Sequence, residues 1–101
     1  MNPFAGVPAF GEHFDGTGET FLFQLRPQVQ SFHWTGENNF FYRVDNECLI
    51  IGSSMGKFGL WIDRDINKGR SQVCATFDNA PLATEEDFTV KTLECWTFEM
   101  A

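Results

Sequence analysis

The residues best suited to nucleophilic or metal chemistry are three cysteines and two histidines. They are Cys48, Cys74, Cys95, His13 and His33. Zinc sites usually combine CxxC pairs or add closely spaced histidines, and the spacings here match neither pattern. Neither histidine lies in a recognisable cysteine-protease context. We therefore expect small, buried, reduced thiols and histidines at the surface or rim.

Cys74 is the thiol that we assign as a candidate redox site. It lies four residues after Arg70, and a cation close to a thiol lowers its pKa. The acidic run Glu85–Asp87 is suited to acid–base chemistry, but it also favours the start of a helical turn, to which we assign it. The sequence shows no arrangement of nucleophile, base and orienting group. It therefore predicts no catalytic residues, no metal site, no cofactor and no enzymatic activity.

One glycine-rich stretch, Gly52–Lys57, has a partial likeness to a phosphate-binding loop. The P-loop has four residues between its glycines, followed by Lys and a hydroxyl residue that binds magnesium. Here three residues separate Gly52 from Gly56, and Phe58 follows Lys57. The stretch is therefore interpreted as a flexible connection between strands.

The stretch Asp63–Asn67 begins like a calcium-binding loop, with oxygen-bearing side chains at its first, third and fifth positions. An EF-hand also needs Gly at position six and Glu at position twelve, where this chain has Lys68 and Cys74. We interpret the stretch as a polar β-turn whose Asp63 and Asp65 side chains accept bonds from turn amides.

Length and composition indicate one globular domain. The 101 residues are 43% hydrophobic and include 12 Phe and 3 Trp, which favour strands over helices. The net charge of −7 disfavours binding to nucleic acid or anionic membranes and favours a basic partner surface. There is no visible secretory signal and no apolar run long enough to span a membrane. These features predict a soluble intracellular protein.

The hydrophobic pattern predicts a mostly β fold of short strands separated by turns. The predicted strands are Thr20–Leu25, Ser31–Trp34, Asn39–Val44, Cys48–Ile51, Phe58–Asp63, Val73–Phe77 and Phe88–Phe98. Ser31–Trp34 and Asn39–Val44 are expected to pair as a hairpin, and Leu82–Asp87 is expected to form one helical turn.

The strand Phe58–Asp63 is expected to lie in the centre of a sheet. Large apolar side chains alternate between its two faces, with Phe58 and Leu60 on one and Trp61 on the other. Both faces are therefore expected to be covered, with Phe58 and Trp61 in the core. Glycine weakens a strand unless a neighbour needs the space, so we expect a bulky group close to Gly59.

An ordered set of segments closely resembles the TLDc domain of the oxidation resistance proteins and their nuclear-receptor-coactivator relatives. The segments are Gly16–Phe23, Trp34–Asn38, Phe58–Asp63, Gly69–Ser71, Cys74–Asn79, Glu86–Phe88 and Glu94–Phe98. The resemblance implies a β-sandwich of two antiparallel sheets with short helical turns.

Two departures from the family pattern stand out. The family usually has a nearly unbroken glycine run where this chain has Gly52–Gly56, which predicts a stiffer loop. The family domain also has a larger N-terminal portion, with a helix and early strands. The expected organisation is therefore an N-terminally truncated domain, with an irregular segment at residues 1–15 and the C-terminal part of a TLDc-like domain at residues 16–101.

The resemblance implies a non-catalytic role in protection against oxidative stress, through binding and regulation of the vacuolar-type proton-pumping ATPase. The cytoplasm is the expected location, with the mitochondrion and nucleus as alternatives. Two other hypotheses remain: direct scavenging of oxidant by a thiol, and a truncated fragment without independent function. The early strands of the family's sandwich have no counterpart in the segments that resemble it. We therefore expect uncovered aromatic faces that favour self-association, partner binding or aggregation.

Overall fold

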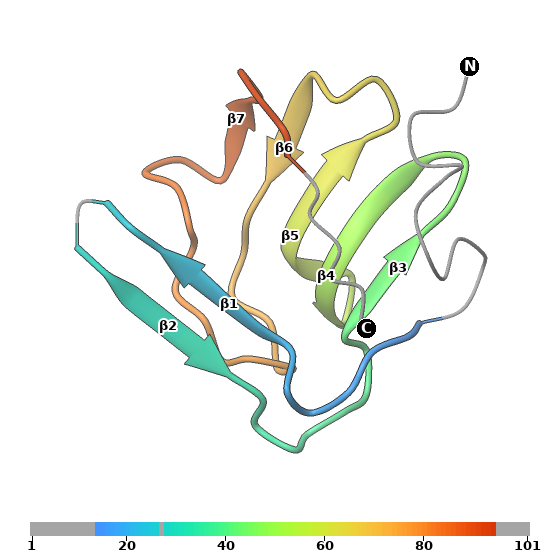
Figure 1. The fold of residues 1–101 in the computed structure, drawn as a ribbon, viewed down its shortest axis with the longest axis vertical. Helices are drawn as coiled ribbons and strands as arrows, with labels where there is room; N and C mark the ends of the chain where they lie inside the picture. The colour runs from blue at the N-terminus through green and yellow to red at the C-terminus, as the bar shows by residue number, and fades with distance from the viewer. Residues whose placement is uncertain (1–13, 27, 95–101) are drawn as a thin grey trace, which may run out of the picture.

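The computed structural model describes residues 14–26 and 28–94, which form two antiparallel β-sheets and contain no helix (Figure 1). β1 (Phe21–Gln24) and β2 (Gln30–His33) form the small sheet. The five-stranded sheet has the order β3-β4-β5-β6-β7. Its strands are β3 (Tyr42–Val44), β4 (Cys48–Ser54), β5 (Lys57–Asp63), β6 (Lys68–Arg70) and β7 (Asp87–Thr89). The all-β architecture of two antiparallel sheets is confirmed.

β5 lies at the centre of the large sheet, as its sequence predicts. It pairs with β4, where Leu49 faces Ile62, and with β6, where Trp61 faces Arg70. The β4–β5 connection is a two-residue turn in which Met55 (φ 49°) and Gly56 (φ 79°) both have positive φ. A turn of this kind matches the twist of the strands that it joins, so the hairpin fixes the register of the two longest strands.

Two groups of buried side chains form the core. The first contains Leu22, Phe41, Cys74 and Phe77, and half-buried side chains from β2, β4 and β5 pack against it. The second contains Val44 and Ile62. Leu60 of β5 packs against both groups. The inner face of the β1–β2 hairpin is thus joined to the large sheet through β5 and the segment that carries Cys74 and Phe77.

Two glycines allow this segment to pack closely on the large sheet. A Cβ atom at Gly59 would lie 2.7 Å from Leu22 Cδ1 and 3.2 Å from Cys74 Sγ. At Gly52, which has a φ of +77°, it would lie 2.8 Å from both Cys74 Sγ and the Phe77 ring. The expectation of a bulky group close to Gly59 is confirmed, because only glycine leaves room for the core side chains here.

The predicted pairing of Asn39–Val44 with Ser31–Trp34 is wrong. β2 pairs with β1, and β3 pairs with β4. Asp45 explains the choice of partner, because its Oδ1 accepts bonds from the amides of Glu47 (2.7 Å) and Cys48 (3.0 Å) and so closes the β3–β4 turn. This local closure pairs β3 with the strand that follows it.

The hydrogen bonds and ion pair of Asp45 predict that the free energy of unfolding falls at low pH. Burial raises the pKa of its carboxyl, but the amides of Glu47 and Cys48 and the guanidinium of Arg43 outweigh burial, so the pKa lies below its usual 3.8. The stabilisation is therefore present above pH 3.8 and is lost as the pH falls through the lower folded pKa. We expect Asp45→Ala to lose about 1 kcal/mol at pH 7, because the partly exposed ion pair is screened. Urea unfolding at pH 7 and pH 2.5 measures this, and an equal loss at both would contradict it.

Three further segments differ from their predictions. Val73–Phe77 is not a strand: a turn covers residues 75–78, and the Asp78 amide donates to Cys74 O at 2.8 Å. Leu82–Asp87 forms bends rather than a helical turn, because Asp87 begins β7 and pairs with Arg70. The last strand ends at Thr89 rather than continuing through residue 94, and its predicted residues 95–98 lie outside the described part of the chain.

Phe58 and Trp61 are only half-buried, and neither belongs to the two groups of buried core residues. Trp61 lies beside β6 and β7, where it lines a hollow of about 470 Å³ with Lys68–Arg70 and Asp87–Thr89. The prediction that both are core residues is therefore wrong. Alternation correctly predicts the opposite faces of β5, but it does not reveal that the Trp61 side is only partly covered.

Candidate functional site

Residues of the family-like segments meet in a buried polar cluster. Thr76, which is fully buried, donates from Oγ1 to Asn38 Oδ1 (2.7 Å) and accepts from the Ser53 amide (3.1 Å). Asn38 in turn donates from Nδ2 to Ser53 O at 3.0 Å. These bonds connect the segment after β2, the end of β4 and the turn at residues 75–78.

The segment after β2 is held against the same turn by its own side chains. Thr35 Oγ1 donates to Ala75 O at 2.6 Å, and the Thr35 amide donates to Thr76 O at 3.0 Å. Trp34 Nε1 donates to Asn38 O at 2.7 Å, and its ring contacts Phe41 edge-on, with centroids 5.4 Å apart. Trp34 and Thr35 thus close the loop that leads from the small sheet to β3.

Asn79 is the centre of a second polar cluster and is fully buried. Its Nδ2 donates to Gln72 O and Ala80 O, both at 2.9 Å. Its Oδ1 accepts from the Cys74 amide at 3.3 Å and lies 3.3 Å from Cys74 Sγ. One carboxamide therefore satisfies backbone groups along the whole segment from Gln72 to Ala80.

Ser71 connects this segment to β5. It is fully buried, its Oγ donates to Gly59 O at 2.7 Å, and the Leu82 amide donates to the same Oγ at 2.7 Å. Thr76, Asn79 and Ser71 each satisfy backbone groups that no regular ladder satisfies. The role of these three residues is therefore structural, and sequence reasoning missed it although all three lie in the family-like segments.

Cys74 lies inside this structure. It is 1% exposed, and its Sγ packs beside Gly52 and Gly59 and contacts Asn79 Oδ1. Cys48 is half-buried, and burial raises the pKa of its thiol above the usual 9.0, with the nearby Asp45 carboxylate adding to the increase. Cys95 lies outside the described residues.

A redox role for Cys74 stays a prediction, and its burial makes that prediction specific. Oxidant reaches Sγ only when the segment around Asn79 opens, so Cys74 should react with peroxide faster in low urea than in buffer. Mass spectrometry of peroxide-treated protein, labelled with a thiol reagent, measures all three cysteines. A redox role requires Cys74 to be oxidised faster than Cys48; slow oxidation at equal rates would contradict it.

The two ligand-like loops adopt ordinary turn structures. Asp63 Oδ1 accepts from the amides of Asn67 (2.8 Å) and Lys68 (3.1 Å), and these bonds lower the pKa of Asp63. The Gly52–Lys57 stretch contains the tight β4–β5 turn. Within residues 14–26 and 28–94, no group of three or more His, Cys, Asp or Glu residues is placed to hold a metal ion.

The other chemically active candidates lie apart from one another on the surface. His33 is exposed on β2 and stacks on Phe21, with ring centroids 5.0 Å apart, as expected for a surface histidine. Glu86 accepts a bond from Gln72, and Asp87 forms a 2.6 Å ion pair with Arg70. His13 lies outside the described residues. The candidates that lie within residues 14–26 and 28–94 are therefore not brought together into one site.

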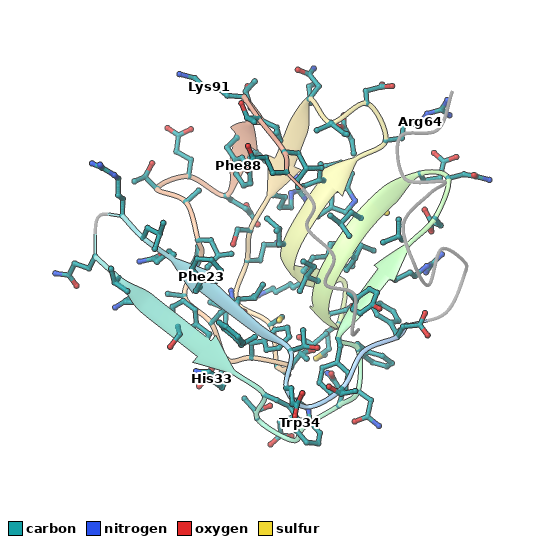
Figure 2. All side chains as sticks on the ribbon, in the orientation of Figure 1. Phe23, His33, Trp34, Arg64, Phe88 and Lys91 are labelled. Carbon is teal, nitrogen blue, oxygen red and sulfur yellow. The ribbon has the colours of Figure 1, made fainter. Side chains whose placement is uncertain are left out.

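The surface instead offers shallow hollows and exposed apolar side chains. A hollow of about 360 Å³ lies between Lys57 and the bends at residues 81–86, and one of about 480 Å³ lies between Arg26 and residues 81–84. Exposed apolar side chains gather on the outer side of the β1–β2 hairpin, where Phe23 is 55% exposed (Figure 2). This arrangement is suited to contact with another protein.

Comparison with known proteins agrees with this structure. The TLDc domain model matches residues 7–99, so the chain belongs to the TLDc domain family. It is 49% identical over 90 residues to nuclear receptor coactivator 7 of Mus musculus, covering 89% of this chain and 10% of that protein. It is 49% identical over 86 residues to oxidation resistance protein 1 of Xenopus tropicalis, covering 85% of this chain and 10% of that protein. The chain thus spans about a tenth of the length of these curated relatives.

The family resemblance seen in the sequence is confirmed. Among the described residues, the structure contains no helix with the length and apolar character needed to cross a membrane.

Proposed function

We propose that this chain is a non-catalytic binding module that protects cells against oxidative stress by docking on, and regulating, the vacuolar-type proton-pumping ATPase. The observation that carries this proposal is that the polar residues in the family-like segments are used to stabilise the fold. Thr76, Asn79 and Ser71 are fully buried and hydrogen-bonded to the backbone, so they maintain the fold and do not face a substrate. What distinguishes such a domain functionally is its surface, which suits protein contact.

The proposed place of action is inside the cell, in the cytoplasm where the peripheral part of the pump is accessible. The net charge of −7 supports encounter with a basic surface on a pump subunit. Charge of this sign also disfavours nucleic acid as the partner.

The test is affinity purification of the tagged chain from cells, with the bound pump subunits identified and then assayed as purified proteins. A variant with Cys48→Ser, Cys74→Ala and Cys95→Ser separates binding from thiol chemistry. The proposal expects this variant, once shown to be folded, to bind pump subunits and to protect cells from peroxide as the wild type does. Loss of protection with retained binding would favour the thiol scavenger. A folded chain that neither binds nor protects would favour the fragment without independent function.

A further inference from the structure

The outer face of the β1–β2 hairpin is an apolar surface with an unusual charge environment. Side chains alternate along β1, so that Leu22 points into the core while Phe21 and Phe23 point outward. Phe21 is 46% exposed and Phe23 55%, and Leu25 and Val29 at the end of the hairpin are 65% and 78% exposed. We call these four residues the hairpin face.

The β1–β2 register makes the hairpin face continuous. Phe21 lies directly across from His33, on which its ring stacks, and Phe23 lies across from Ser31. Phe21 and Phe23 are themselves in contact, with ring centroids 6.0 Å apart. Phe23 and His33 mark this face in Figure 2.

The hairpin face is free of acidic residues although the chain is strongly acidic. Of 14 Asp and Glu residues, none occurs between Glu19 and Glu37. Two chains of net charge −7 repel each other, and the repulsion is strongest where carboxylates are brought together. The hairpin face is a surface through which two copies can meet without that cost.

The two ends of β1 carry opposite charges, so two antiparallel copies of β1 place a negative end beside a positive end. Glu19 precedes β1 and Arg26 follows it, both are exposed, and neither forms an ion pair with another described residue. In a two-fold contact of antiparallel β1 strands centred on Phe23, Glu19 of one copy lies one position from Arg26 of the other, within reach of the long arginine side chain, and the reverse pair forms at the same time. The same operation places Phe23 on Phe23 and Phe21 on Leu25.

We propose that the hairpin face is an interface with a second copy of this chain, in which the two β1–β2 sheets stack face to face about their shared two-fold axis. Stacked sheets lie about 10 Å apart, so the outward side chains of the two copies interdigitate to form a small sandwich. The exposed apolar surface of the hairpin face is roughly 400 Å² per copy. A stable dimer needs about 800 Å² per partner, so the expected dimer is weak and reversible.

Sedimentation velocity of the full chain tests the proposal, with samples from about 1 to about 200 µM, the range in which a weak dimer dissociates. The wild type should shift from monomer to dimer over this range. Phe23→Glu should weaken the dimer about tenfold or more, because it places two carboxylates at the two-fold axis. Met55→Glu is the matched control: Met55 is fully exposed at the β4–β5 turn, and the variant should dimerise as the wild type does.

A charge exchange tests the antiparallel arrangement without altering the apolar surface. Glu19→Arg and Arg26→Glu should each weaken the dimer, since each creates two like-charged pairs, while the double variant should restore it. The arrangement is overturned if the double variant is weaker than both single variants. The interface itself is overturned if the wild type remains monomeric throughout, or if Phe23→Glu and Met55→Glu behave alike. It is also overturned if the wild type is monomeric and binds a pump subunit that the Phe23→Glu variant does not bind, because the hairpin face then contacts that partner.

Discussion

Phe77→Ala is expected to remove a large part of the stability of this domain. Phe77 is 2% exposed and belongs to the group of core residues that joins the β1–β2 hairpin to the large sheet. Its ring lies over Gly52, which has no side chain to fill the space left behind. Truncation of a buried Phe costs about 3–5 kcal/mol, against about 5–15 kcal/mol for a whole domain. Urea unfolding followed by tryptophan fluorescence measures the change.

Phe23→Ala is the matched control for this prediction. It removes the same atoms from a side chain that is 55% exposed, so it should cost less than about 1 kcal/mol at concentrations where the chain is monomeric. A Phe77→Ala variant with the unfolding midpoint of the Phe23→Ala variant would show that the segment around Phe77 does not join the two sheets.

The strands with local signals were predictable from sequence. β5 has large apolar side chains on both faces and ends at Asp63, and its central place follows from that pattern. β1 and β4 likewise contain short apolar runs bounded by turn residues, and β2 alternates its single apolar residue, Phe32, with polar ones. Their existence depends on alternation within a few residues, which a single sequence displays.

The partners of these strands and the path of residues 71–86 were not predictable in the same way. Val73–Phe77 has the composition of a strand, yet Thr76 and Asn79 draw its backbone into a turn through side-chain bonds. The Thr76 bonds involve Asn38 and Ser53, which are far away in sequence. Local pattern therefore indicates the wrong element, because the deciding contacts are formed only in the tertiary structure.

For the candidate site, sequence reasoning found the loops and the exposed face but not the polar clusters. The failed spacing at Asp63–Asn67 correctly favoured a turn, since Asp63 bonds the amides that follow it. The predicted flexible connection at Gly52–Lys57 is only the two-residue turn at Met55 and Gly56, because its other residues belong to β4 and β5. Uncovered aromatic faces were also expected, and Phe21 and Phe23 are exposed. One sequence signal could have indicated the polar clusters: short polar side chains stand beside apolar ones in the family-like segments, at Ser71, Thr76 and Asn79.

Asn79→Leu is expected to be about as damaging as the loss of a core aromatic residue. The two side chains have the same number of heavy atoms, so the change leaves no cavity; it removes the hydrogen bonds and adds some crowding from the bulkier methyl groups. Without the carboxamide, the Cys74 amide, Gln72 O and Ala80 O lose their bonds to a fully buried side chain. Each buried group left without a partner costs about 1–3 kcal/mol, so we expect the three groups together to cost at least about 3 kcal/mol. Thermal unfolding and urea unfolding both report it.

The consequence of this change should extend to the thiol that Asn79 covers. Asn79 holds the backbone of residues 72–80 in the conformation that buries the Cys74 thiol. The Leu variant should therefore react with a thiol reagent at Cys74 much faster than the wild type. Asn39→Leu is the control, since Asn39 is exposed and its replacement should change stability by less than about 0.5 kcal/mol. If Asn79→Leu unfolds at the wild-type midpoint and leaves Cys74 protected, the backbone of this segment must be held by its apolar contacts alone. In that case Phe77, rather than Asn79, determines the path of the chain between β6 and β7.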